Sequence, residues 1–501
     1  MVWRSLRWDV ALVLGVLGIC WLHAVHWAPN HDASVILVEA HKILAGGQFH
    51  QDVMETNPPL AIFLSMPGVL LGQALGCSQW AGVMLWFGLI IASSALCVSR
   101  VLARALPDVS GAWRALVLWW GLAVLPGHDF GQREHLAVCL LLPALVSFAV
   151  ADIPGSLSRP RAGYTVLWLV ASVGLMLKPF FALVLAAGLL ARSVWRRDWR
   201  LLFGVEFRAV VSGAVVYAAA IWWWARPWLD TLALTVQAYF GYNASWQDVW
   251  AAYQSQFLLG SVAAFCLLLW PGIAMQRRFF AQLLCVAASW AALALLQQKG
   301  WSYHLLPAVA LLSIALGLMA ALVWRAGRRW ATVPILSLMG AMGASGAIFA
   351  VDPLSTRQAQ LNSPFAQAVI RHAQGRPWVA WSTAVTPAFP LVSMVEGEWA
   401  SRMVCQWLIP GVLKLEARPQ ADEDQVMRLR TLAARMNAED LEKHRPAVVL
   451  VQQEGHLFVS GPFDFLRFFS VDPAFRTAWS NYRRVEVVGG WAVYIRHEPP
   501  L

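Results

Sequence analysis

Residues 304–324 read HLLPAVALLSIALGLMAALVW, a run in which no acidic or basic side chain follows His304. A helix needs about 20 apolar residues to cross a bilayer, so this run is long enough to span one. Of the 501 residues, 59% are hydrophobic and only 13% are charged, whereas soluble domains carry about 25% charged residues. The composition therefore excludes an ordinary soluble enzyme and predicts a polytopic α-helical membrane protein.

Apolar runs of this kind recur through the first 351 residues, and we predict about eleven transmembrane helices. The predicted crossings are residues 9–27, 80–99, 115–127, 136–151, 163–177, 179–195, 208–225, 256–275, 280–298, 304–324 and 331–350.

The net charge of +10 belongs almost entirely to the apolar part. Residues 1–351 hold 22 basic and 13 acidic side chains, whereas residues 352–501 hold 16 and 15. No basic face that would bind nucleic acid is therefore expected. Lys and Arg collect in the cytoplasmic loops of membrane proteins. If the apolar residues 58–76 lie along the outer surface, 17 of the 22 basic residues fall on the cytoplasmic side, so we expect a cytoplasmic N-terminus.

Two domains follow from this division. Residues 1–351 form the membrane domain, in which residues 28–79 are an outer loop with surface helices. Residues 352–501 form an extracytoplasmic α/β domain, with a charged amphipathic helix at 422–444. Its predicted strands are residues 378–384, 447–453, 485–490 and 491–497.

Polar residues with catalytic chemistry gather in the outer loops of the membrane domain, which contain all eight of its histidines. The loop after the first crossing carries Asp32, Asp52 and Glu55. Asp32 opens a helical stretch whose apolar residues suit a helix on the membrane surface and which ends at Gly46 and Gly47. An alternative interpretation makes Asp32 only the N-cap of that helix.

Three further groups lie where the chain enters or leaves the membrane. An ionisable residue there is costly unless it is paired or functional. Each group has a structural alternative: an Arg133–Glu134 pair, an interfacial anchor at Lys178, or a turn in an aromatic belt around residues 299–304. The candidate site residues are Arg133, Glu134, His135, Lys178, Lys299, Tyr303 and His304.

In order, the chain presents an acid just after the first crossing, a G-G turn, D-x-x-x-x-N-P-P-L, R-E-H, L-K-P and K-G-W-S-Y-H-L-L-P, followed by the α/β tail. This layout resembles the GT-C class of polyprenyl-phosphate-dependent glycosyltransferases. Within that class it is most similar to bacterial relatives of protein O-mannosyltransferases and of the aminoarabinose transferase that modifies lipid A.

The resemblance implies sugar transfer from a polyprenyl-phosphate donor to a lipid, glycan or protein acceptor, with inversion, on the periplasmic face of the bacterial inner membrane. It implies that Asp32 activates the acceptor. Ala33 stands where many members have a second acid, so a divalent cation is left open, with Asp52, Glu55, Asp129 or Glu134 as replacement carboxylates. The residues implied to bind the donor phosphate are Arg133, Lys178, Lys299, Tyr303 and His304.

Two other classes of protein remain as alternatives. A polymerase or ligase of polyprenyl-linked polysaccharides is expected to use a large outer loop between helices rather than a C-terminal domain. A secondary transporter is expected to place ionisable residues at mid-membrane, with broken helices in two related halves. Here the ionisable groups lie at the outer edge of the predicted helices.

Overall fold

The computed structural model describes residues 2–151, 153, 161–270, 276–459, 461 and 463–497. The chain divides into two compact units. Unit 1 comprises Met1–Val25, Leu70–Ala220 and Ala244–Asp352, and unit 2 comprises His26–Val69, Ile221–Asn243 and Pro353–Leu501. The break at residue 352 lies next to the predicted domain boundary. The contacts also place residues 26–69 and 221–243, which the sequence division assigned to the membrane domain, with the C-terminal residues.

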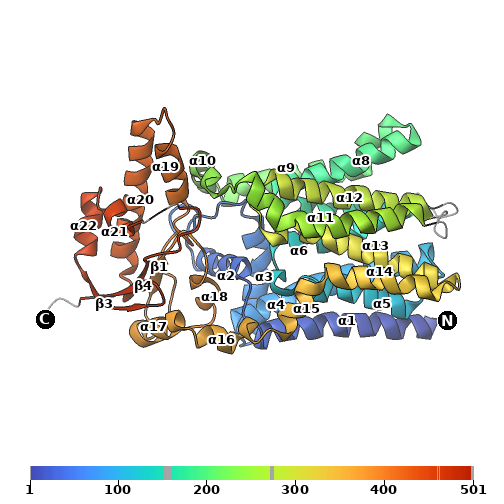
Figure 1. The fold of residues 1–501 in the computed structure, drawn as a ribbon, viewed down its shortest axis with the longest axis horizontal. Helices are drawn as coiled ribbons and strands as arrows, with labels where there is room; N and C mark the ends of the chain where they lie inside the picture. The colour runs from blue at the N-terminus through green and yellow to red at the C-terminus, as the bar shows by residue number, and fades with distance from the viewer. Residues whose placement is uncertain are drawn as a thin grey trace. The chain divides into compact units, whose positions relative to one another are not determined.

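Unit 1 consists of long helices that run side by side (Figure 1). Its helices are α1 (Val2–Val25), α4 (Gln79–Ala105), α5 (Gly111–Trp119), α6 (Arg133–Val150), α7 (Arg161–Met176), α8 (Ala182–Arg196), most of α9 (Val205–Trp224), α11 (Trp246–Leu269), α12 (Arg277–Leu296), α13 (Leu306–Arg325), α14 (Arg329–Met342) and α15 (Ala344–Val351).

Among the described residues, eight helices are long and apolar enough to cross a membrane, and the bent pair α14 and α15 would make a ninth. The predicted crossings at 115–127 and 163–177 correspond to shorter apolar helices, Gly111–Val124 and Ala162–Met176. This arrangement confirms the predicted fold class of a polytopic helical membrane protein. The count of eleven crossings stays a prediction.

Helix α6 lies at the centre of unit 1. It is buried along its whole length and packs against α4, α7, α12 and α13. In contrast, α9 exposes Val215 and Val216, and α11 exposes Leu258 and Phe265. Such outward apolar side chains suit contact with lipid acyl chains.

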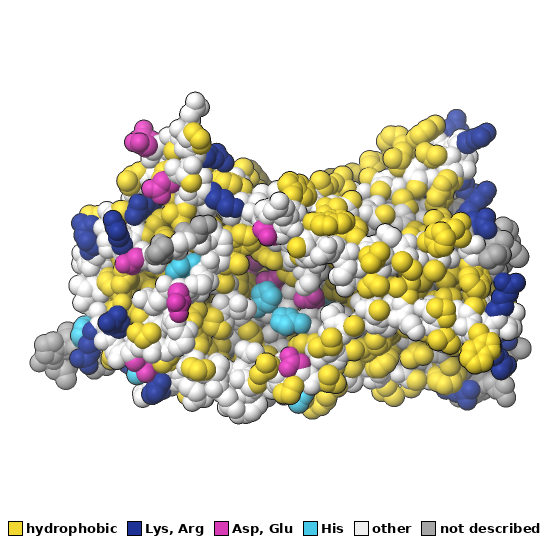
Figure 2. All heavy atoms as spheres, viewed as in Figure 1, with side chains coloured by type: hydrophobic (Ala, Val, Ile, Leu, Met, Phe, Trp, Pro, Cys, Tyr) yellow, Lys and Arg dark blue, Asp and Glu magenta, His cyan; other side chains and the backbone are white. Residues whose placement is uncertain are grey.

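The arginine-rich turns of unit 1 meet at one end of its helices, where Figure 2 shows Lys and Arg side chains gathered near the N-terminus. Arg325 Nη2 lies 3.4 Å from Asp108 Oδ1, which joins the turn after α13 to the turn after α4. Arg196 donates to the carbonyl of Ala151, 3.1 Å away, which brings the end of α8 to the end of α6. The segregation of Arg expected from the positive-inside rule is therefore present within this unit.

Unit 2 holds a four-stranded sheet of order β1-β2-β4-β3, in which β1 and β2 are parallel and the other pairs antiparallel. Its strands are β1 (Trp378–Trp381), β2 (Val448–Gln452), β3 (Tyr482–Val488) and β4 (Trp491–Arg496). Its helices are α2 (His31–Leu44), most of α3 (Leu60–Ala74), α10 (Trp228–Ala238), α16 (Arg357–Leu361), α17 (Pro364–Ala373), α18 (Ala388–Leu391), α19 (Leu408–Glu416), α20 (Glu423–His444), α21 (Phe465–Phe469) and α22 (Pro473–Trp479).

Both faces of β1 are covered by aromatic side chains. Trp378 and Trp381 point to opposite sides of the strand, since side chains alternate along it. Trp378 contacts Phe365 of α17, with ring centroids 6.3 Å apart. Trp381 contacts the aromatic rings of α21 and α22, including Phe469 at 5.3 Å and Phe475 at 5.6 Å. This two-sided burial explains why the predicted strand is apolar throughout.

Helix α2 forms as predicted, but its apolar face does not lie on a membrane surface. Val35, Ile36 and Leu37 are each only 4% exposed, and α2 packs against α18 within unit 2. Three consecutive buried residues cover more than one face of a helix, so protein surrounds α2. Gly46, with φ +93°, follows its last turn in the left-handed conformation that glycine adopts at low cost.

Candidate functional site

The end of unit 1 opposite the arginines holds a buried ion pair between Lys178 and Glu134. Lys178 Nζ donates to Glu134 Oε1 at 2.6 Å, and the two side chains are 6% and 1% exposed. Lys178 is extended because it precedes Pro179, which opens the turn into α8. Glu134 lies in the first turn of α6.

Tyr303 and His304 join this pair from the 3₁₀ turn Ser302–Leu305, just before α13. His304 Nε2 lies 3.8 Å from Glu134 Oε1. The Lys178 ammonium lies 5.7 Å from the centroid of the Tyr303 ring, within the range of a cation–π contact. Three segments that are distant in the sequence therefore converge on one carboxylate.

Arg133 and Lys299 complete what we call the cationic cluster, defined as Arg133, Glu134, Lys178, Lys299, Tyr303 and His304. The positive charges of Lys178, Lys299 and Arg133 all act on the His304 ring. Arg133 and Lys178 are buried and Lys299 is partly exposed, so three cations gather around His304 at this end of unit 1. All five residues predicted to bind the donor phosphate lie in this cluster, where an anion would be stabilised strongly.

Two polar atoms of the cationic cluster have no hydrogen-bond partner within the described part of the chain. They are Glu134 Oε2 and His304 Nδ1, and both are buried. Buried polar atoms are nearly always hydrogen-bonded, so these atoms are available to a bound substrate or water. The sequence suggested a pair of Arg133 with Glu134 as a structural alternative, whereas in the structure Glu134 pairs with Lys178.

His135 is placed differently from the other candidates of this region. Its Nε2 lies 2.8 Å from the carbonyl of Leu122, and its Nδ1 accepts from the amide of Gly131 at 3.1 Å. Both ring nitrogens are therefore engaged with the backbone. This geometry favours a role in fixing the turn before α6.

Asp32 lies in the first turn of α2 in unit 2 and is not the N-cap. Asn30 occupies that position, and its Oδ1 accepts from the amides of Asp32 at 2.9 Å and Ala33 at 3.2 Å. The Asp32 carboxylate is 15% exposed and lies 3.7 Å from His31 Nε2. Asn30 thus caps the helix, so the carboxylate of Asp32 is not needed for capping.

Glu55 lies in the same region of unit 2 as Asp32. The charges of both carboxylates act on the Cys405 thiol. Glu55 is 6% exposed, and its Oε1 accepts from both the backbone amide and the side-chain amide of Asn57 at 2.7 Å. The carboxylate therefore also orders the turn that follows it.

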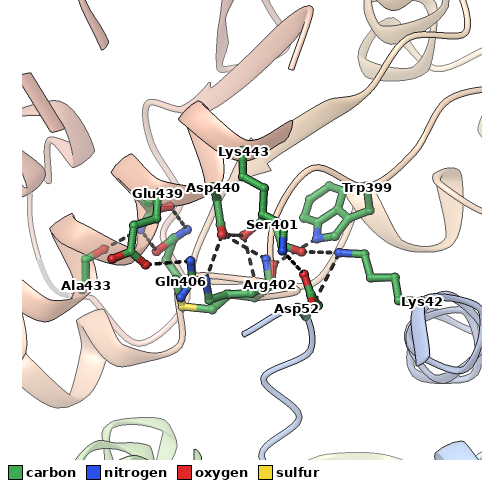
Figure 3. A network of polar contacts seen from close by, with 12 residues as sticks. Lys42, Asp52, Trp399, Ser401, Arg402, Gln406, Ala433, Glu439, Asp440 and Lys443 are labelled. Carbon is green, nitrogen blue, oxygen red and sulfur yellow. Dashed lines mark hydrogen bonds and ion pairs between the residues drawn. The ribbon is translucent and has the colours of Figure 1, made fainter. Parts of the chain in front are cut away.

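Asp52 belongs to a polar network rather than to this carboxylate region (Figure 3). It pairs with Lys443 of α20 and accepts from the amide of Gln48 at 2.9 Å. Burial raises the pKa of the Asp52 carboxyl, but these contacts outweigh burial and bring the pKa below its usual value.

No sequence pattern pointed to several residues of this network. Lys42 contacts Ser401, and the network residues Ser401, Arg402 and Asp440 lie 359 or more positions further along the chain. Of the segments that carry them, only the charged helix at 422–444 was predicted. Asp440 is only 2% exposed. In a helix that carries many charges, the periodicity of the sequence does not distinguish such a buried acid from the exposed ones. Cys405, which lies near both carboxylates, was likewise not proposed.

A metal centre was left open by the sequence. No group of three or more His, Cys, Asp or Glu side chains suited to hold a metal ion occurs among the described residues.

Comparison with known proteins gives matches among solved structures. No protein-family model and no curated protein matches the sequence. The structure is similar to the crystal structure of ArnT from Cupriavidus metallidurans in the apo state, with a TM-score of 0.51 and 14% sequence identity over 98% of both chains. The chain has the GT-C fold. At this identity the GT-C fold is what the likeness shows.

Proposed function

We propose that this protein is a membrane glycosyltransferase that moves a sugar from a polyprenyl-phosphate-linked donor to a lipid, glycan or protein acceptor on the periplasmic face of the bacterial inner membrane. The observation that carries the proposal is the cationic cluster, which brings three cations together with Tyr303 and His304 at one end of unit 1 in a chain with the GT-C fold. A secondary transporter would instead be expected to place its ionisable residues at mid-membrane.

The cationic cluster would bind the donor phosphate. As the bond between the anomeric carbon and the phosphate oxygen breaks, the electron pair leaves with the polyprenyl phosphate, and negative charge grows on its oxygens. Arg133, Lys178 and Lys299 would stabilise that charge, while Tyr303 and His304 would donate hydrogen bonds. A low-dielectric setting strengthens each of these interactions.

Asp32 would act as the general base. Its carboxylate would take the proton from the acceptor hydroxyl or amine as that atom attacks the anomeric carbon. A single displacement without a covalent intermediate inverts the configuration at that carbon. Glu55, Asp52, Glu134 and His135 would support the site, of which Glu134 holds Lys178 and His135 holds the turn before α6.

The experiment is to incubate the purified protein with a panel of labelled polyprenyl-phosphate sugars and candidate acceptors and to measure donor consumption and the anomeric configuration of the product. We expect one donor to be consumed with inversion. Asp32→Asn should abolish transfer, whereas Asp248→Asn, which alters an exposed carboxylate at the start of α11, should not.

Three outcomes would contradict the proposal. Consumption of no donor in the panel would exclude the activity. A product ladder of repeating units would instead indicate a polymerase or ligase. Full activity of Asp32→Asn, or retention of configuration, would exclude Asp32 as the base of a single displacement.

A further inference from the structure

The segment 401–406 of unit 2 is fixed to α20 by several hydrogen bonds (Figure 3). Asp440 accepts from Ser401 Oγ and from the Arg402 amide, both at 2.9 Å, and from Arg402 Nε at 2.8 Å. Gln406 and Asn437 exchange two side-chain hydrogen bonds of 2.9 and 3.0 Å. Asp440 is 2% exposed and Asn437 is 1% exposed, so this segment is an ordered support.

Two consecutive carbonyls of this support hold two other segments. Lys42 Nζ, near the end of α2, donates to the carbonyl of Ser401 at 2.6 Å. The amide of Met54 donates to the carbonyl of Arg402 at 2.9 Å. Lys42 Nζ also lies 3.5 Å from the carbonyl of Asp52. Lys42 therefore joins α2, the segment around Asp52 and the support in one place.

The two segments that Lys42 joins carry the two carboxylates near Cys405. Asp32 lies at the start of α2, and Glu55 follows directly on Met54. Ten residues separate Asp32 from Lys42, which corresponds to about 15 Å along a helix. The start of α2 has its own attachment, since Ser34 Oγ hydrogen-bonds Ser393 Oγ. Lys42 thus fixes the C-terminal end of α2.

We infer that Lys42 is a positioning residue, which sets the direction of α2 and the separation of Asp32 from the Glu55 segment by anchoring both to the support on α20. The inference rests on the proposed function for its kinetic consequence. Its structural part, the anchoring of residues 31–55, does not depend on any activity. An error of 1 Å in the placement of reacting groups costs about 100-fold in rate.

The test compares Lys42→Met with Lys42→Arg and with Lys414→Met. Lys414 is a matched control, because its Nζ also donates to a backbone carbonyl of unit 2, that of Asn243 at 2.8 Å, and it does not contact α2. Burial lowers the pKa of both lysines. The measurements are hydrogen exchange across residues 31–55 in the full-length protein and kcat and KM for sugar transfer.

We expect Lys42→Met to speed hydrogen exchange in residues 38–55 by about tenfold or more. It should lower kcat about tenfold while leaving the KM for the donor within about twofold, because the donor phosphate is bound by other residues. Lys42→Arg, which retains a charged donor, should restore most of both losses. Lys414→Met should leave exchange in residues 31–55 unchanged.

Unchanged exchange in a folded Lys42→Met protein would overturn the inference, as would an equal loss in Lys414→Met. If Lys42→Met fails to fold, Lys42→Arg still tests the inference, since loss of most of the exchange protection in residues 38–55 or of most of kcat in that folded variant would contradict it. An inactive wild type with normal exchange would instead contradict the proposed function alone.

Discussion

Lys178 and Glu134 place opposite charges where each is at most 6% exposed. Removing one partner of such a pair leaves an uncompensated buried charge, which typically costs about 3–5 kcal/mol. We expect Lys178→Met to lower the stability of the protein by about this amount and Lys178→Met/Glu134→Gln to recover most of it. Thermal unfolding in detergent measures both effects.

Measuring sugar transfer by the same double variant distinguishes a structural role of Lys178 from a functional one. The double variant should remain inactive in sugar transfer although its stability is restored, because it lacks a cation proposed to bind the donor phosphate. If the double variant regains both stability and activity, Lys178 has only a structural role.

Cys405 offers a second test on a single side chain. Burial raises the pKa of its thiol to about 12, and the carboxylates of Asp32 and Glu55 add to the shift, while Tyr242 opposes it. Since the thiolate is the reactive form, Cys405 should resist iodoacetamide at pH 8, whereas the exposed Cys77 should be alkylated. Peptide mass spectrometry gives both rates, and equal rates would show that Cys405 is accessible.

The nature of the site residues was more predictable than their partners. Glu134 and Lys178 were both singled out, since an ionisable residue at a membrane boundary must be paired or functional. Their mutual contact spans 44 positions and depends on how α6 and the turn before α8 pack, which periodicity does not report. Local capping is similar, because both Asn30 and Asp32 suit an N-cap and only the backbone geometry selects Asn30.

At the scale of an element, helix α15 passes very close to the turn after the π-helical segment Trp120–Val124. A Cβ at Gly346 would lie 2.6 Å from the carbonyl oxygens of Val124 and Leu125. Gly346→Ala should therefore destabilise the protein by about 1–3 kcal/mol. Gly340→Ala on α14, where a Cβ has open space, should be neutral or stabilising, and equal thermal unfolding of the two variants would refute this packing.

Helix α22 begins at a carboxylate with two tasks. Asp472 accepts from the amide of Ala474 at 2.7 Å and from Arg435 Nε at 2.8 Å. Burial raises the pKa of this carboxyl, but these contacts outweigh burial and lower the pKa below 3.8. The stabilisation is therefore present above the unfolded-state value and is lost as the pH falls through the lower folded-state value.

Asp472→Asn should consequently lower the unfolding temperature at pH 7. The difference from wild type should shrink as the pH falls below about 4, because protonation neutralises the wild-type carboxyl as well. A difference that stays constant from pH 7 to pH 3 would show that charge is not involved.

Local sequence patterns predicted the helices and strands, but they did not predict what packs against each of them. The charged helix expected at 422–444 is α20 at Glu423–His444, and the four expected strands form one sheet. The apolar residues of α2 indicated burial correctly. Whether lipid or protein covers them depends on residues beyond 380, such as those of α18, which no local pattern can identify.

At the scale of the whole molecule, the path of residues 58–76 determines the topology. Helix α3 has 15 residues and is among the shorter apolar helices, about 22 Å long at 1.5 Å per residue, which is less than the roughly 30 Å of a bilayer core. This length supports the prediction that α3 does not cross. In a Cys77→Ser background, which removes the exposed native thiol, cysteine substitutions at the exposed Gln51 and Leu75 should then be labelled from the same side by an impermeant reagent.

Asp108→Cys, in an exposed turn at the arginine-rich end, should be labelled from the opposite side, and this variant serves as the internal reference. Labelling of Gln51→Cys and Leu75→Cys from different sides would mean that α3 crosses the membrane. The expected cytoplasmic N-terminus would then need revision.

The two-part organisation was predictable from composition at residue 351, but the membership of the parts was not. Most of residues 26–69 and 221–243 lie between predicted crossings, yet both ranges fold with residues 353–501. Composition reports which segments avoid lipid. It does not report which of those segments share a core.

The hydrogen bond from Lys42 to Ser401 spans 359 positions, so during synthesis it can form only some time after α2 has been made. At a synthesis rate of about 5–20 residues per second, α2 leaves the ribosome roughly 20–70 s before Ser401 does. During that interval the segment carrying Asp32 is already made but has no anchor from α20. Anchoring of this segment would therefore be completed only after residues 401–444 are made, and a truncation before Ser401 would yield a product with its first helices made and its candidate base without this anchor.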